Sequence, residues 1–453
     1  MPQTVSLAET TGYRWRWWAL AALLVAEAMN LLDTTIVQVA GPTMHADLGG
    51  PAAVIPWFST AYTLPFAVLL ITGGRLGDIA GRRRVFRIGV VAFMVASIAC
   101  APAPSVGLLI AFRVVQGAAA AVIIPQTIGL IRTMFAGAEM GRALGTIGPV
   151  MGLAAVCGPV LGGVLTHADL FGSSWRAVFL VNVPLSVAVL ALAPLLRENR
   201  APQRPGLDPL GTLLATIGTA LIVYPLVSST GMAALSWIGV AAGLAVLVLF
   251  GVQQRRSRGR GLVEVSLFTH RVFPAALATS LLFFAVTSGL TLVVVLHLQL
   301  GLGADVLTAG LTLLPWSVAM GVTSWVTGAY LVPRFGRRLM PAGLAIALAG
   351  VAACDVAFPG AASGPRLVAL GVVGAGVGVF TTSFFTTALQ AVAPQEVGSA
   401  AGLLNAAQQL GATLGVAVLG SVYLSGSGTQ AAFWIAGALL VTTVATSALM
   451  RSA

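Results

Sequence analysis

The chain has 453 residues, of which 58% are hydrophobic and 8% charged, and its mean hydropathy is +0.96. Soluble proteins carry about 25% charged residues, so this composition excludes a soluble globular enzyme. It also excludes an intrinsically disordered protein, which needs low hydrophobicity and high charge. Because a membrane-spanning helix takes about 20 apolar residues, length and composition predict a polytopic membrane protein without a second soluble domain.

The first apolar run, residues 17–39, follows Arg14 and Arg16 as a signal-peptide core would. The run is too long for a signal peptide and contains Glu27 and Asp33, so we expect it to remain as the first helix. Fourteen apolar runs can be placed in chain order, and they predict an all-α membrane protein with fourteen transmembrane helices. The runs are residues 17–39, 53–73, 85–103, 107–127, 143–165, 176–196, 208–227, 233–252, 273–296, 307–331, 340–358, 367–392, 398–422 and 431–450.

The basic residues gather at one end of this predicted bundle. The net charge is +11, and all 24 basic residues are arginine. All but Arg113, Arg176 and Arg366 lie in, or at the edges of, segments on the same side as the N-terminus. By the positive-inside rule, both termini are then cytoplasmic. The charge therefore reports topology, and we expect a lipid bilayer rather than nucleic acid as its partner.

A weak repeat suggests how the helices are grouped. Residues 79–83 (IAGRR) follow the second predicted helix, and residues 334–338 (RFGRR) follow the tenth. Duplication of a six-helix unit would separate these motifs by six helices, so a separation of eight indicates two inserted helices. The predicted organisation is a six-helix bundle at 1–200, two inserted transmembrane helices at 201–260 and a second six-helix bundle at 261–453.

Several motifs lie in order along the first 184 residues. They are residues 32–42 (LDTTIVQVAGP), 74–84 (GRLGDIAGRRR), 113–117 (RVVQG), Gly152 with 158–163 (GPVLGG), and 175–184 (WRAVFLVNVP). Together they resemble the major facilitator superfamily, specifically its fourteen-helix drug:proton antiporter branch. Two of these motifs depart from that pattern: in one, Ile79 stands where a basic residue is usual, and in the other Gln38 and Gly41 replace the usual Asn and bulky aliphatic residue. The first departure puts the family's loop salt bridge in doubt.

Asp33 and Arg113 are the leading candidates for proton coupling. A carboxylate inside hydrocarbon costs at least about 2.5–3.5 kcal/mol, so Asp33 must pair, protonate or face water. Arg113 lies mid-run and cannot lose its proton. An Asp–Arg pair across two helices therefore predicts a group that binds and releases a proton as a cavity closes and opens; a purely structural salt bridge is the alternative.

Glu27 is a further candidate for proton coupling. It lies about 120° around the helix from Asp33, with Asn30 between them, so a broad polar sector is one interpretation and a local pair the other. Asp355, near the end of its run, is expected to reach the membrane interface.

Glycines and loop charges are candidates for conformational roles. Small residues let helices approach closely, and a proline favours a kink, so the fifth run predicts a pliable contact between the two halves, with ordinary packing as the alternative. The resemblance implies that the loop motif helps hold the outward-facing state; membrane anchoring is its alternative. The candidates are Gly74, Asp78, Gly81, Arg82, Gly152, Gly158, Pro159, Gly162 and Gly163.

Polar and aromatic side chains within the runs are candidates for the substrate cavity. They are Asn30, Gln38, Gln116, Gln126, Trp316, Phe384, Asn405 and Gln409. Hydrogen bonding between helices is the alternative for each amide.

Together these features predict a proton-coupled antiporter that exports drug-like hydrophobic or amphipathic small molecules across the cytoplasmic membrane. A dedicated exporter of one natural product or metabolite is an alternative, and a non-transporting receptor is one of a different class. We expect no enzyme activity, cofactor or metal site: the cysteines Cys100, Cys157 and Cys354 are odd in number and lie in or beside apolar runs. The expected partners are the substrate, protons and lipid, and a monomer is compatible with them.

Overall fold

The computed structural model describes residues 13–169, 172–198, 206–228, 234–257, 261–269, 271–360, 362–390, 392 and 396–450. The predicted boundaries at residues 200–201 and 260 lie outside these ranges. So do Arg200, Arg204, Arg258, Arg260 and Arg451, which contributed to the predicted topology. Within the described ranges the regular structure is entirely helical.

The helices of the first part of the chain are α1 (Arg16–Leu48), α2 (Ile55–Ala80), α3 (Arg82–Cys100), α4 (Val106–Met134), α5 (Gly137–Gly145), α6 (Ile147–His167), α7 (Ala177–Leu180) and α8 (Asn182–Leu192), with the short turns η1 (Ala52–Val54), η3 (Ser174–Arg176) and η4 (Ala193–Leu195). Two helices follow, α9 (Pro209–Ser228) and α10 (Ala234–Arg256). The remaining helices are α11 (Val272–Leu296), α12 (Val306–Thr312), α13 (Leu314–Val326), α14 (Val332–Phe335), α15 (Leu339–Ala357), α16 (Ser363–Gln390), α17 (Val397–Val422) and α18 (Gly428–Leu449), with the turns η5 (Val265–Phe268), η6 (His297–Gly301), η7 (Thr327–Leu331), η8 (Gly336–Arg338) and η9 (Tyr423–Ser427).

The predicted count of fourteen transmembrane helices is wrong. In the part of the chain that the structure describes, twelve helices are long and apolar enough to cross a membrane. One difference arises at α3, which is not among the twelve because Arg82, Arg83, Arg84 and Arg87 interrupt its apolar sequence. The other arises at α17 and α18, which count as one run, Val397–Leu449, although the backbone kinks between them at Gly426, where φ is +86°.

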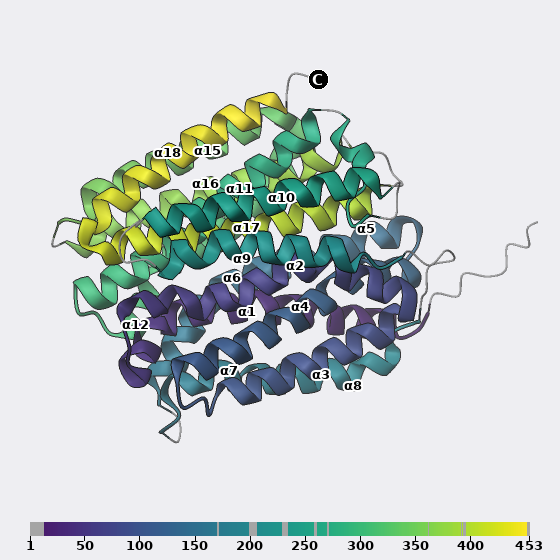
Figure 1. Ribbon diagram of the computed structural model, residues 1–453, viewed down its shortest axis with the longest axis horizontal. Helices are drawn as coiled ribbons and strands as arrows, with labels where there is room; N and C mark the ends of the chain where they lie inside the picture. The colour runs from purple at the N-terminus through teal and green to yellow at the C-terminus, as the bar shows by residue number, and fades with distance from the viewer. Residues whose placement is uncertain are drawn as a thin grey trace, which may run out of the picture.

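The long helices run side by side, with α5 at one end of the bundle and α12 at the other (Figure 1). The first helices, drawn purple to blue, form one side, and the last, drawn green to yellow, form the other. The teal pair α9 and α10 pack against each other, and α9 also contacts α2 and α17. The largest apolar cluster takes its buried residues from 267–450 and adds Val39 of α1, so the second side has its own core.

Two sets of helices connect the sides. α2 packs against α17, and α6 packs against α12 and α13. At mid-depth the Thr413 hydroxyl donates to Thr63 Oγ1 at 2.7 Å, which joins α17 to α2. Near the end that carries α12, Gln299 Nε2 donates to the Val39 carbonyl at 2.8 Å, which joins η6 to α1.

Candidate functional site

A fully buried ion pair joins α1 to α4. Arg113 Nη1 lies 2.5 Å from Asp33 Oδ2, and both side chains are 0% exposed. Moving two charges out of water costs several kcal/mol per ion, and their attraction compensates only where the geometry is good and the remaining polar atoms find partners. The surroundings of Asp33 therefore decide whether this pair can persist.

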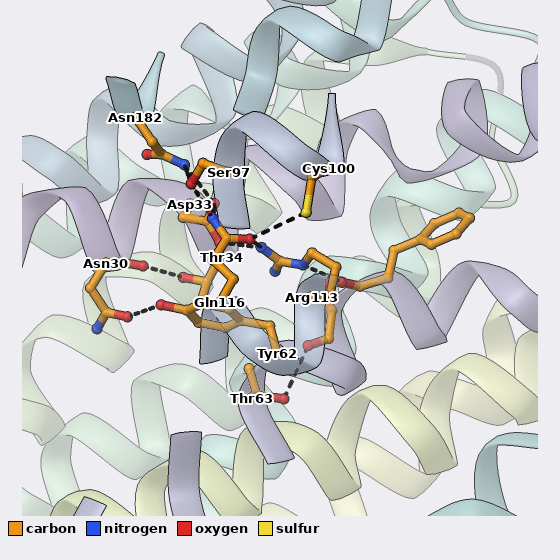
Figure 2. A network of polar contacts seen from close by, with 12 residues as sticks. Asn30, Asp33, Thr34, Tyr62, Thr63, Ser97, Cys100, Arg113, Gln116 and Asn182 are labelled. Atoms are coloured by element: carbon orange, nitrogen blue, oxygen red, sulfur yellow. Dashed lines mark hydrogen bonds and ion pairs between the residues drawn. The ribbon is translucent and has the colours of Figure 1, made fainter. Parts of the chain in front are cut away.

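Neighbouring helices supply those partners for Asp33 (Figure 2). Asp33 Oδ1 accepts hydrogen bonds from Gln116 Nε2 at 2.9 Å and from Asn182 Nδ2 at 2.8 Å. Gln116 Nε2 also donates to Ser97 Oγ at 2.8 Å, and Asn182 is within 3.4 Å of the same hydroxyl. The carboxylate is thus held by α3, α4 and α8 together, in a network of side chains that water does not reach.

The orientation of the Arg113 side chain is also fixed by several contacts. Its Nε donates to the Phe58 carbonyl of α2 at 2.9 Å, and its Nη1 donates to Gln116 Oε1 at 2.7 Å. The guanidinium carbon lies 4.4 Å from the centre of the Tyr62 ring, a cation–π arrangement. Nη2 is buried without a hydrogen-bond partner. The Nη2 amino group therefore has no acceptor in this arrangement. Because Arg113 bonds to both α1 and α2, the positions of both helices depend on where its side chain lies.

In this arrangement, protonation of Asp33 would alter the contacts between helices. Protonation of Asp33 would remove the negative charge that balances Arg113, and a buried charge without its partner costs about 3–5 kcal/mol. The guanidinium would then have to find water or another acceptor. Gain and loss of one proton can thus shift the positions of α1, α2 and α4 relative to one another.

Glu27 lies apart from this network. It is half-buried on α1 and faces Thr127 of α4. Asn30 accepts a hydrogen bond from the Tyr62 hydroxyl, so it meets the network at its edge. The predicted polar sector of α1 is therefore divided: Asn30 reaches the Arg113 surroundings through Tyr62, and Glu27 faces a different part of α4.

The other cavity candidates are dispersed. Gln116 belongs to the buried network, whereas Gln126 Nε2 donates to the Gly73 carbonyl at 2.8 Å and packs α4 against α2. Trp316 and Phe384 are buried in the apolar cluster of the second side. Gln38, Asn405 and Gln409 are half-buried, and so is Asp355.

The loop motif forms a compact contact at the end of the bundle that carries α5. Asp78 Oδ1 lies 2.5 Å from Arg82 Nη2, an ion pair across the end of α2. Gly81 adopts φ +104°, a left-handed conformation that favours glycine. Glu198 caps α3 by accepting from the backbone N–H groups of Arg83 at 3.0 Å and Arg84 at 3.3 Å. Gly74 packs against Pro125 of α4.

The glycines of α6 lie between two helices. A Cβ at Gly158 would meet Thr35 of α1, and one at Gly162 would lie 3.0 Å from the Ile36 carbonyl oxygen. On the opposite side, a Cβ at Gly163 would lie 3.0 Å from the Leu307 Cα of α12. We call this contact of α6 with α12 and α13 the α6 seam.

Two further glycine contacts extend the α6 seam. A Cβ at Gly310 would lie 2.4 Å from the Pro159 carbonyl oxygen, and one at Gly152 would lie 3.8 Å from Gly321 of α13. Small residues on both sides thus let the backbones approach.

Three network residues were missed by the sequence reasoning. Asn182 stands inside the motif at 175–184, which was quoted without a role for it. Ser97 lies on α3, where one hydroxyl in an apolar run has no distinguishing pattern, and Tyr62 is one of several aromatic residues in its run. Among the described residues no group of three His, Cys, Asp or Glu side chains is placed to hold a metal ion.

Known proteins similar to this chain are membrane transporters. The chain is 44% identical to a probable actinorhodin transporter of Streptomyces coelicolor, over 92% of this chain and 74% of that protein. It is 34% identical to a puromycin resistance protein of Streptomyces alboniger, over 95% and 88%. It is 33% identical to a tetracenomycin C resistance and export protein of Streptomyces glaucescens, over 94% and 79%.

Solved structures give the same fold. The crystal structure of a D-xylose-proton symporter superposes with a TM-score of 0.68 at 14% identity, over 95% of this chain and 97% of that one. A family model described as Major Facilitator Superfamily matches residues 23–416. The chain therefore belongs to the Major Facilitator Superfamily, a family of membrane transporters.

Proposed function

We propose that this multi-pass membrane transporter is an antiporter that exports drug-like hydrophobic or amphipathic small molecules in exchange for protons. The drug:proton antiporter resemblance of its motifs supports the proposal, and so do the antibiotic resistance and export names of its relatives. The observation that carries it is the ion pair of Asp33 and Arg113, two charges held without water inside the apolar half of the chain that bears the motifs. Such intramembrane charges are functional sites by default.

Asp33 is the proposed proton carrier. Arg113 stabilises its ionised form, and Gln116 and Asn182 hold the carboxylate in place. A proton arriving from outside would neutralise Asp33 and release Arg113, which favours a different arrangement of α1, α2 and α4. Glu27, which lies on the same helix and faces α4, is proposed to assist by accepting a second proton or a cationic substrate group.

Movement of the two sides by alternating access is proposed to follow from this release. In the α6 seam, glycines lie close to the backbone of the facing helices, and we propose that these close, smooth contacts let the seam slide or open at low cost. The Asp78–Arg82 pair and the capped start of α3 form a rigid end that we propose to hold the outward-facing state.

We propose a location in the cytoplasmic membrane, with both termini in the cytoplasm, from the distribution of arginines. The division of the chain into bundles at 1–200 and 261–453, with an inserted segment at 201–260, remains a prediction. It is supported by the separate apolar core of the second side and by the pairing of α9 with α10. We propose that a monomer is sufficient for this mechanism, because α4 and α8 of the same bundle already supply the partners of both Asp33 carboxylate oxygens.

A dedicated exporter of one natural product is the second candidate. Relatives named for a single antibiotic favour it, among them the probable actinorhodin transporter and the tetracenomycin C exporter. The candidates differ in how many compounds they move. An exporter of one product should transport a single chemical class from a panel that includes aromatic polyketides, nucleoside antibiotics and lipophilic cations.

The test is transport by the purified chain in proteoliposomes, with the compound panel and with or without an imposed pH gradient. The proposal predicts uphill movement of at least one compound only when a gradient is present, and dissipation of the gradient by that compound. Gradient-independent binding without flux would contradict transport, and uphill movement without a gradient would contradict proton coupling.

A further inference from the structure

An apolar groove opens on the side of α1 that the proton site does not use. It has a volume of about 280 Å³ and is lined by a stripe of α1 from Ala21 to Leu32, with Val150 of α6 and Leu185 of α8 as its walls. The stripe uses positions three and four residues apart, which lie on one face of a helix. Asn30 faces α2 through Tyr62, so the groove and the polar sector of α1 lie on different sides of the same helix.

The groove has the length of one membrane leaflet. From Ala21 to Leu32 an α-helix rises roughly 16 Å at 1.5 Å per residue. Half of a hydrocarbon core is about 15 Å thick. Ala21 lies near the start of α1, so the groove begins near the membrane surface on the N-terminal side and ends near the midplane. This is the depth that a single lipid acyl chain occupies.

Each of the three helices that form the groove has an exposed arginine in the segment next to it, at the end of the groove near Ala21. Arg14 precedes α1, Arg142 lies on α5 just before α6, and Arg197 follows α8. Two contacts place these segments together. The Arg197 guanidinium lies 4.6 Å from the centre of the Tyr13 ring, and Arg16 pairs with Glu139 of α5 at 2.7 Å. That pair neutralises Glu139, and Glu198, which follows Arg197, accepts hydrogen bonds from the start of α3. Four arginines (Arg14, Arg16, Arg142 and Arg197) against these two carboxylates leave positive charge in excess at the mouth.

We propose that this groove binds an anionic phospholipid of the cytoplasmic leaflet, with one acyl chain along α1 and the phosphate near Arg14, Arg142 and Arg197. An apolar slot whose three flanking segments each carry an exposed arginine at the same end is complementary to that ligand in both polarity and charge. The inference rests on the proposed orientation of the termini and is independent of proton coupling. The bound chain would fill the space between α6 and α8 and support the position of α6 at its seam.

The experiment is native mass spectrometry of the full chain, released from membranes in mild detergent and titrated with phosphatidylglycerol or phosphatidylcholine. Ala28→Phe fills the groove, and Val95→Phe adds the same ring to an exposed position of α3. The double variant Arg142→Gln/Arg197→Gln removes charge from the mouth, and Arg334→Gln removes an exposed arginine of α14. Asp33→Asn separates lipid binding from the proposed antiport.

The parent, both controls and Asp33→Asn should retain phosphatidylglycerol in preference to phosphatidylcholine. Ala28→Phe should retain at least about fivefold less phosphatidylglycerol than the parent. The double arginine variant should lose the preference for the anionic lipid. Equal retention by Ala28→Phe and the parent would overturn the proposal. If Ala28→Phe retained the lipid but no longer bound an exported compound, the groove would be a substrate site, and the proposal would again be overturned.

Discussion

Asp33 on α1 and Arg113 on α4 form an ion pair that neither water nor lipid reaches, and four helices contribute to its surroundings. The pair joins the helix that carries the first motif to the helix that carries the third. On the proposed mechanism, a proton on Asp33 would change the contact of α1 with α4 directly, and the position of α2 through the Phe58 carbonyl.

Asp33→Asn should destabilise the protein more than the double variant Asp33→Asn/Arg113→Gln. The single change leaves the Arg113 charge buried without its partner, at a cost of about 3–5 kcal/mol, whereas the double change removes both charges. Thermal unfolding of the detergent-solubilised variants measures the difference. Equal melting temperatures for the single and double variants would show that the guanidinium reaches water and that the pair is not coupled.

Arg113→Lys should be nearly as damaging to transport as Arg113→Gln. A lysine keeps the charge, but a single ammonium cannot contact Asp33, Gln116 and the Phe58 carbonyl in the fixed geometry of the guanidinium. Substrate efflux from cells at matched expression measures the effect. Efflux at the parental rate in Arg113→Lys would mean that charge alone is sufficient.

The α6 seam should be sensitive to a single methyl group. A Cβ at Gly163 would lie 3.0 Å from the Leu307 backbone, which cannot turn aside, so Gly163→Ala should reduce transport several-fold. Gly148→Ala, on the same helix, is the matched control because nothing lies within 4 Å of its Cβ.

Transport and thermal stability of the two glycine variants should be measured together. Similar transport in both would mean that the close approach at Gly163 has no part in the conformational cycle. A loss of transport that follows a loss of folding would assign Gly163 to packing alone.

Asp208 should make the stability of the folded protein depend on pH in the acidic range. It lies just before α9 and is 8% exposed. Burial opposes its ionisation, but hydrogen bonds from the Gly211 and Leu262 backbone and from Gln253 and Gln254 outweigh burial and lower the pKa of this carboxyl from 3.8. A lowered folded-state pKa stabilises the folded protein above the unfolded value, and this stabilisation is lost as pH falls through the folded value.

Asp208→Asn should therefore flatten the pH dependence of the melting temperature below about pH 4, the ordinary range of an aspartate. Melting curves of parent and variant at a series of pH values measure this, with Asp355→Asn as the control. Parallel curves for the parent and Asp208→Asn would contradict the assignment.

The sequence was most informative where a charge lies within an apolar run. Asp33 and Arg113 had to find partners in hydrocarbon, so a pairing of the two could be expected on energetic grounds. The superfamily and the transporter class followed from the motifs, and the comparisons confirm both.

The remaining site residues could not be chosen in this way. An amide that binds substrate and one that packs two helices have the same sequence signal, and Gln126 is of the second kind. Helices that are apolar on every face do not show which face is buried, so Trp316 and Phe384 could not be recognised as core. The helix count failed because four arginines lie in the first turns of α3 and because only the short kinked turn η9 separates α17 from α18.

The most direct test of proton coupling compares two modes of transport by Asp33→Asn in proteoliposomes. Substrate exchange at equal pH requires the cavity and the conformational change but no net proton movement, whereas uphill export requires the proton. We predict that Asp33→Asn retains exchange within about twofold of the parent and loses export driven by the pH gradient. Full gradient-driven export by Asp33→Asn would contradict the account.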